Sequence, residues 1–123
     1  MKSFTLLLFP GLIFFGAIAT LAAPGSFNDV PVTDETVIAA AKFAIEAKTE
    51  DMQDEKKPNS VQLKLLKLLS AQQQVVSGIN YKLKLYVSLD GEEKEAEAVV
   101  WWQSWRQPDP YQLTSWTWME KGR

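Results

Sequence analysis

The 123-residue sequence contains no cysteine and no histidine. The lack of cysteine excludes disulfides, thiolate metal ligands and thiol nucleophiles, and the lack of histidine excludes imidazole acid–base catalysis. The 13 basic residues do not outnumber the 15 acidic ones, so no nucleic-acid partner is expected. Hydrophobic residues make up 46% of the chain and charged residues 23%, which predicts one folded domain.

The N-terminal stretch, residues 1–22, is predicted to be a signal peptide. A short basic start precedes an uncharged apolar run over residues 4–23. A transmembrane anchor is the alternative, since about twenty apolar residues can span a bilayer. Proline and glycine interrupt the run and small residues gather at its end, which favours a leader cut after Ala19 or Ala22. We therefore expect a secreted domain over residues 23–123, with no membrane contact once the leader is removed.

One helix is predicted from residue 35 to about residue 50, with Thr33 or Asp34 as its N-cap. Small side chains on its apolar side would let a sheet wrap closely around it: Val37, Ala40, Ala41, Ala44 and Ala47. Residues 24–32, before the helix, show no periodicity and are expected to be loosely ordered. Residues 50–60 are polar and contain a proline, so they are expected to form a loop.

The second half of the chain predicts an antiparallel sheet. Residues 79–89 alternate between apolar and polar side chains, and the dipeptide Asp90-Gly91 signals a hairpin. Residues 95–102 alternate as the returning strand. Residues 61–69 are ambiguous, because leucine and lysine favour a helix whereas the alternation of apolar residues favours a strand with a bulge. One helix followed by antiparallel strands gives an α+β fold.

The last predicted strand covers residues 111–118. Simple alternation places Tyr111 and Leu113 on one face and Trp116 and Trp118 on the other. It follows a turn that contains two prolines, and Trp105 lies beside that turn.

The sequence contains no combination of residues typical of an enzyme. A nucleophile–base pair and a glycine-rich phosphate loop are both missing. Its carboxylates cluster at 50–55 and 92–97, where a solvated surface explains them. We therefore expect no catalytic residues, no metal site and no cofactor.

Two features are poorly explained by folding alone. The segment Gln74-Val75-Val76-Ser77-Gly78 would place branched apolar residues at a hairpin tip, where polar residues and glycine are usual. Trp105 would be exposed, and exposed tryptophans often anchor binding partners.

Together with the N-terminal arm, these features resemble the cystatins, which inhibit papain-like cysteine proteases. Residues 74–78 match the Q-x-V-x-G motif of that family, and Gly25 matches the glycine of its N-terminal trunk. Residues 98–105 are similar to the strand that leads into its second hairpin, with Trp105 on the tryptophan of its Pro-Trp pair. Ala40-Ala41-Lys42-Phe43-Ala44-Ile45 resembles the helix signature L-A-R-F-A-V of plant cystatins, and residues 78–81 resemble G-x-N-Y of animal ones. Ser104 replaces the family's proline, and the disulfides of secreted animal cystatins are missing.

The resemblance implies a cystatin-like fold, with an antiparallel sheet wrapped around one long helix and residues 61–73 as a strand. It implies a monomer that reversibly inhibits papain-like cysteine proteases, because the trunk and two hairpin loops would fill the active-site cleft. Val75 and Val76 would bury apolar surface, Gly78 would allow a close backbone approach, and Trp105 would be an aromatic anchor. The protease-binding residues implied are Gly25, Gln74, Val75, Val76, Ser77, Gly78 and Trp105.

A competing hypothesis is a secreted binding module. Trp101, Trp116 and Trp118 would then form an aromatic platform for a carbohydrate or an apolar ligand. Exposed tryptophans on a face of the sheet, away from the first hairpin tip, would favour this hypothesis.

Overall fold

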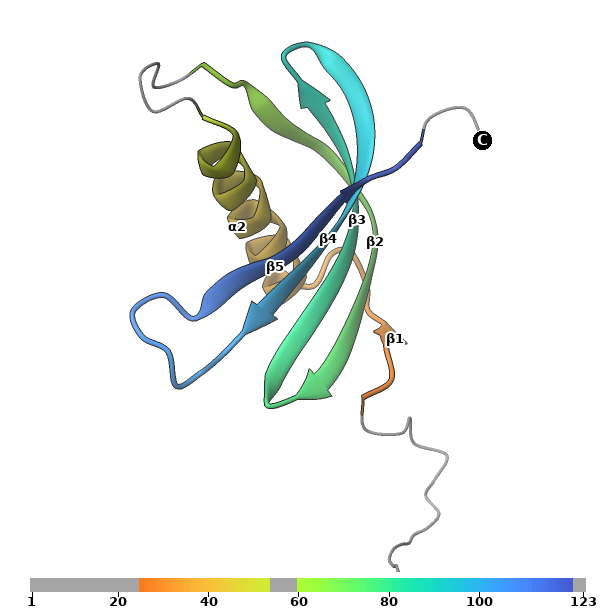
Figure 1. The fold of residues 1–123 in the computed structure, drawn as a ribbon. Helices are drawn as coiled ribbons and strands as arrows, with labels where there is room; N and C mark the ends of the chain where they lie inside the picture. The colour runs from red at the N-terminus through yellow and green to blue at the C-terminus, as the bar shows by residue number, and fades with distance from the viewer. Residues whose placement is uncertain (1–24, 54–59, 121–123) are drawn as a thin grey trace, which may run out of the picture.

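The computed structural model describes residues 25–53 and 60–120. It contains the helix α2 (Glu35–Met52) and five strands: β1 (Asn28–Asp29), β2 (Leu63–Val76), β3 (Gly78–Leu89), β4 (Glu92–Trp102) and β5 (Tyr111–Trp118). The strands form one antiparallel sheet in the order β1-β2-β3-β4-β5, and the sheet curves around α2 (Figure 1). This confirms the predicted α+β architecture of an antiparallel sheet wrapped around one long helix.

The predicted signal peptide, residues 1–22, lies outside the described residues. Within residues 25–53 and 60–120, no helix combines the length and the hydropathy needed to cross a membrane.

The helix α2 begins where the sequence predicted. Asp34 is its N-cap, and the Asp34 carboxylate accepts a hydrogen bond of 2.8 Å from the backbone N–H of Thr36. Hydrogen bonds from the Thr36 side chain and backbone lower the pKa of Asp34 below its usual value. The core-facing side is fully buried and consists of one valine and three alanines: Val37, Ala40, Ala41 and Ala44. Their small volume lets the sheet approach the helix closely.

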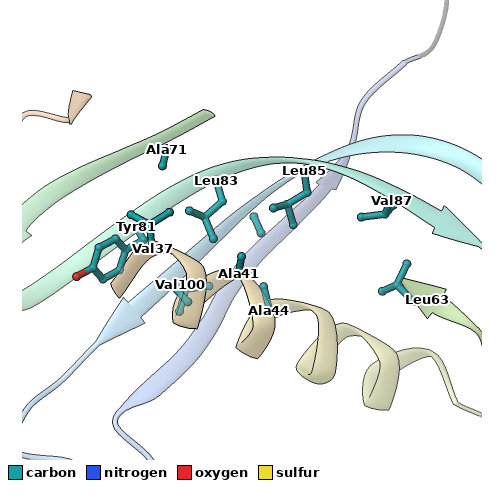
Figure 2. Packing of buried hydrophobic residues seen from close by; sticks show 12 residues of the cluster. Val37, Ala41, Ala44, Leu63, Ala71, Tyr81, Leu83, Leu85, Val87 and Val100 are labelled. Atoms are coloured by element: carbon teal, nitrogen blue, oxygen red, sulfur yellow. The ribbon is translucent and has the colours of Figure 1, made fainter. Parts of the chain in front are cut away.

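The core lies between this side of α2 and the inner face of the central strands (Figure 2). Leu83, Leu85 and Val87 of β3 and Val100 of β4 are fully buried, as the alternation predicted. The hairpin between β3 and β4 turns at Asp90-Gly91, where both residues have positive φ. These two strands supply most of the buried aliphatic volume, so they fix which face of the sheet meets the helix.

Strand β2 resolves the ambiguity at residues 61–69 in favour of a strand. It pairs with β3 from Leu63↔Leu89 to Val76↔Gly78. The register shifts between Leu65 and Lys67 and again between Leu68 and Ser70, so the bulge that the sequence predicted near Lys67 has Leu66 as its extra residue. Pairing with β3 outweighs the helix propensity of leucine and lysine, because propensity is a weak preference that tertiary contacts override.

The prediction for Trp116 and Trp118 was wrong. Val99 pairs with Ser115 but Val100 pairs with Leu113, so β5 has one extra residue at this point. Beyond this bulge Trp116 and Trp118 lie opposite the buried Ala98 and Ala96, and both rings pack against the core on the side of α2. Simple alternation failed because a bulge reverses the face to which the following side chains point.

Candidate functional site

The β2–β3 hairpin forms the first loop, residues 75–78. Val75 and Val76 are 60% and 41% exposed. Tight hairpin turns usually carry polar residues or glycine, so exposed valines are unusual at this position. The hairpin is tight, since Val76 pairs with Gly78 across Ser77 alone. The predicted apolar tip is therefore present and solvent-facing.

Gly78 is required by the chain's own packing. Its φ is +84°, and a Cβ built on it would lie 2.1 Å from the carbonyl oxygen of Trp102. The indole Nε1 of Trp101 would be 3.1 Å from the same Cβ. The space beside Gly78 is thus filled by β4, so the need for glycine here is explained within the protein and does not require a target backbone.

The second loop, residues 103–110, joins β4 to β5. It is closed at its base by a hydrogen bond of 2.7 Å from the backbone N–H of Gln103 to the carbonyl oxygen of Pro110. The Arg106 guanidinium also donates to the carbonyl oxygen of Tyr111, at 3.2 Å. Trp105 is 59% exposed at this loop, and its ring meets the ring of Trp101 edge-on, with centroids 6.2 Å apart. These contacts hold the second loop although Ser104 takes the place of the family's proline.

The N-terminal arm, residues 25–32, is more ordered than the sequence predicted. Its strand β1 pairs with β2, with Asn28 opposite Gln73, and the N–H of Val30 donates to the carbonyl oxygen of Ala71 at 2.9 Å. The carbonyl oxygen of Gly25 accepts a hydrogen bond from the side-chain amide of Gln74. The sequence reasoning missed this pairing, since two residues are too short a strand to show periodicity.

The arm and the two loops lie at the same end of the sheet (Figure 1). Contacts of two strand residues connect them. Gln74, next to the first loop, donates to Gly25 of the arm, and Trp101 of β4 donates its indole N–H to the carbonyl oxygen of Ser77 at 2.7 Å and meets the Trp105 ring of the second loop. We call this surface the rim, defined by the seven residues predicted from the sequence: Gly25, Gln74, Val75, Val76, Ser77, Gly78 and Trp105. The structure brings all seven together.

Two further residues contact the rim and were not among the protease-binding residues predicted from the sequence. Asn80 donates from its side chain to the Gln74 Oε1 at 2.8 Å, and Trp101 links the two loops as described above. Asn80 lies within the quoted G-x-N-Y segment, so its position was visible in the sequence but its contact with Gln74 was not.

A shallow hollow of about 400 Å³ lies beside the first loop, lined by Val76, Ser77, Asn80, Trp101 and Thr114. None of the rim residues ionises between pH 2 and 12, roughly. The described residues also contain no cluster of side chains that could hold a metal ion. The rim can therefore bind a partner through apolar and hydrogen-bonding contacts, and it lacks the groups for catalysis.

The aromatic platform of the competing hypothesis is not formed. Trp101 packs at the rim against Ser77 and Trp105, whereas the rings of Trp116 and Trp118 meet edge-on on the helix side, with centroids 5.3 Å apart. The bulge in β5 causes this separation. The tryptophan-based binding module therefore loses its structural basis.

Comparisons with known proteins agree with this geometry. A family model described as "SQAPI: Aspartic acid proteinase inhibitor" matches residues 29–119. The chain is 31% identical over 114 residues to L-cystatin of Tachypleus tridentatus, a match that covers 76% of this chain and 82% of the relative. The salivary cystatin of the soft tick Ornithodoros moubata superposes with a TM-score of 0.61 at 20% identity, over 80% of this chain and all of its own. Dimeric human cystatin F superposes with a TM-score of 0.62 at 15% identity, over 85% of this chain and 94% of its own.

Proposed function

Because this chain belongs to the cystatin family of proteinase inhibitors, we propose that it reversibly inhibits papain-like cysteine proteases. Members of this family are inhibitors and not enzymes, and the sequence lacks the nucleophile–base pair that an enzyme would need. The arm and the two loops would enter the active-site cleft together and exclude substrate.

The observation that carries the proposal is the convergence of three separate segments on the rim. Val75, Val76 and Trp105 are among the most exposed large apolar side chains of the described residues. Burying a valine fully against a cleft wall would contribute about 1.5–3 kcal/mol. Two valines and one tryptophan could then supply much of the binding energy of a tight complex without a covalent bond.

A second candidate target class is the aspartic proteinases, favoured by the description of the matching family model. The motif at residues 74–78 favours the cysteine proteases. Since the rim itself carries no charge, neither class is excluded by electrostatics.

We also propose that the protein is secreted and that residues 1–22 are removed. The position of the cut affects the arm, because cleavage after Ala19 leaves five residues before Gly25 and cleavage after Ala22 leaves two. A longer arm would reach more subsites, so the shorter product is expected to dissociate faster. N-terminal sequencing of the secreted protein, combined with dissociation rates for both forms, tests this.

The decisive experiment titrates the protein, without its leader, against papain and against pepsin with fluorogenic substrates. We expect inhibition of papain, and at least a tenfold loss of affinity in Val75→Asp and in Trp105→Ala, because both remove apolar contacts of the rim. Leu66→Asp is the matched control, since Leu66 is 47% exposed on the same strand but far from the rim. Equal inhibition by all variants would refute the proposal, and inhibition of pepsin alone would replace it with the second candidate.

A further inference from the structure

We propose that Gln74 is a positioning residue: its side-chain amide fixes the N-terminal arm against the first loop before any target binds. This inference deepens the proposed function and rests on it, since it concerns how the same rim is assembled.

Both ends of the Gln74 amide have a partner. Its Oε1 accepts from the Asn80 side chain at 2.8 Å, and its Nε2 donates to the carbonyl oxygen of Gly25. Gln74 and Asn80 are direct partners in the β2–β3 ladder, so their side chains lie on the same face of the sheet. Because a carbonyl can only accept, the Asn80 N–H₂ group turns the Gln74 N–H₂ group toward Gly25.

The rest of the arm is held further along β2. The Gln72 side chain donates to the Asp29 carboxylate at 3.1 Å, and the ring of Phe27 lies 4.3 Å from the Lys82 ammonium. These contacts secure residues 27–29, two or more residues beyond Gly25. Gln74 therefore makes the contact with β2 that lies nearest to the start of the described chain.

The backbone conformation of Gly25 makes its hydrogen bond with Gln74 important for the order of the arm. Its φ is +92°, and among the described residues other than its chain neighbours no atom lies within 4 Å of the position of a Cβ, so none of them packs against this side of the glycine. Without the Gln74 amide, the backbone at Gly25 would lose its hydrogen bond to the side of the first loop. Ordering Gly25 in the free protein lowers the entropy cost of binding.

The first test measures the arm directly and needs no protease. Because the chain has no cysteine, Ser26→Cys provides a unique site for a nitroxide label. We expect Gln74→Leu to increase the nanosecond mobility of the label in electron paramagnetic resonance spectra. Gln62→Leu, the same change at an exposed glutamine next to the opposite end of β2, is expected to leave the mobility unchanged. Unchanged mobility in Gln74→Leu would overturn the inference.

The second test measures inhibition of papain by the unlabelled variants. Loss of one hydrogen bond that orders the arm is expected to weaken inhibition about twofold to tenfold, with no effect in Gln62→Leu. If Gln74→Leu does not fold, Gln74→Glu keeps the size and the acceptor for Asn80 but removes the donor to Gly25. Greater mobility with unaltered inhibition would also overturn the positioning role. If the unsubstituted protein fails to inhibit papain, the proposed function is refuted, and the label still decides whether Gln74 holds the arm.

Discussion

Substitution of Gly78 by alanine offers a quantitative test of how the first loop packs against β4. An L-residue held at φ +84° costs about 1–2 kcal/mol relative to glycine. The added Cβ would also lie 2.1 Å from the Trp102 carbonyl oxygen, so the backbones of β3 and β4 must separate by about 1 Å. We expect a total loss of about 3–5 kcal/mol in the free energy of unfolding.

A loss of that size is a large fraction of the stability of a small domain, which is about 5–15 kcal/mol. It corresponds to a fall in Tm of roughly 15–30 °C, measurable by calorimetry and by urea unfolding followed through tryptophan fluorescence. Gly91→Ala is the control, since Gly91 has φ +89° but no atom within 4 Å of the Cβ position. Gly91→Ala therefore measures only the cost of holding an alanine at positive φ, about 1–2 kcal/mol, without the cost of a steric clash. If Gly78→Ala loses no more stability than Gly91→Ala, the close approach of the first loop to β4 is refuted.

Three further outcomes are expected. Trp101→Phe keeps the ring beside Trp105 but removes the N–H that binds Ser77, so affinity for papain is expected to fall about twofold to tenfold with little change in Tm; equal affinity would show that this bond does not position the first loop. The hydrogen bonds from Thr36 lower the pKa of Asp34. The ionised Asp34 N-cap therefore stabilises the fold fully above its usual pKa of 3.8, and this stabilisation is lost as the pH falls through the lowered pKa of the folded protein. Asp34→Asn is therefore expected to lessen the fall in Tm below about pH 4, and an unaltered Tm profile would contradict this. Inhibition of papain is expected to be independent of pH between about 5 and 8 after correction for the enzyme's own titration, because the rim carries no group that ionises there. A pH dependence that remains after this correction would show that an ionisable group of the inhibitor outside the rim contacts the enzyme.

Much of the fold could be predicted because its strongest signals are local. The N-cap at Asp34, the alternation of β3 and the turn at Asp90-Gly91 each depend on a few neighbouring residues. Residues 61–69 show the limit of such signals, since their propensity favours a helix and only pairing with β3 makes them a strand. The family resemblance supplied the correct choice, because it carries information about tertiary pairing that propensity lacks.

The errors have a common physical origin in contacts between distant segments. The extra residue in β5 follows from its register with Val99 and Val100, which nothing within residues 111–118 reveals. The arm is ordered by β2, whose glutamines lie more than 40 residues away along the chain. For the site, the motif at residues 74–78 identified the first loop, but not the hydrogen bonds of Asn80 and Trp101 that connect it to its neighbours.

The uncharged rim has a consequence for choosing between the two target classes. Aspartic proteinases such as pepsin depend on a pair of carboxyl groups that share one proton, so they are assayed in acid. Acid would leave the rim chemically unchanged, and the buried core that supports it is apolar. The ion pair of Lys94 with Glu92 has an N–O distance of 3.9 Å and is partly exposed, so it contributes little to the stability of the fold. Failure to inhibit pepsin by a protein shown to be folded at the assay pH would therefore reflect a mismatch of shape between rim and cleft. The target class favoured by the Q-x-V-x-G motif, the cysteine proteases, would then be the one whose cleft fits the rim.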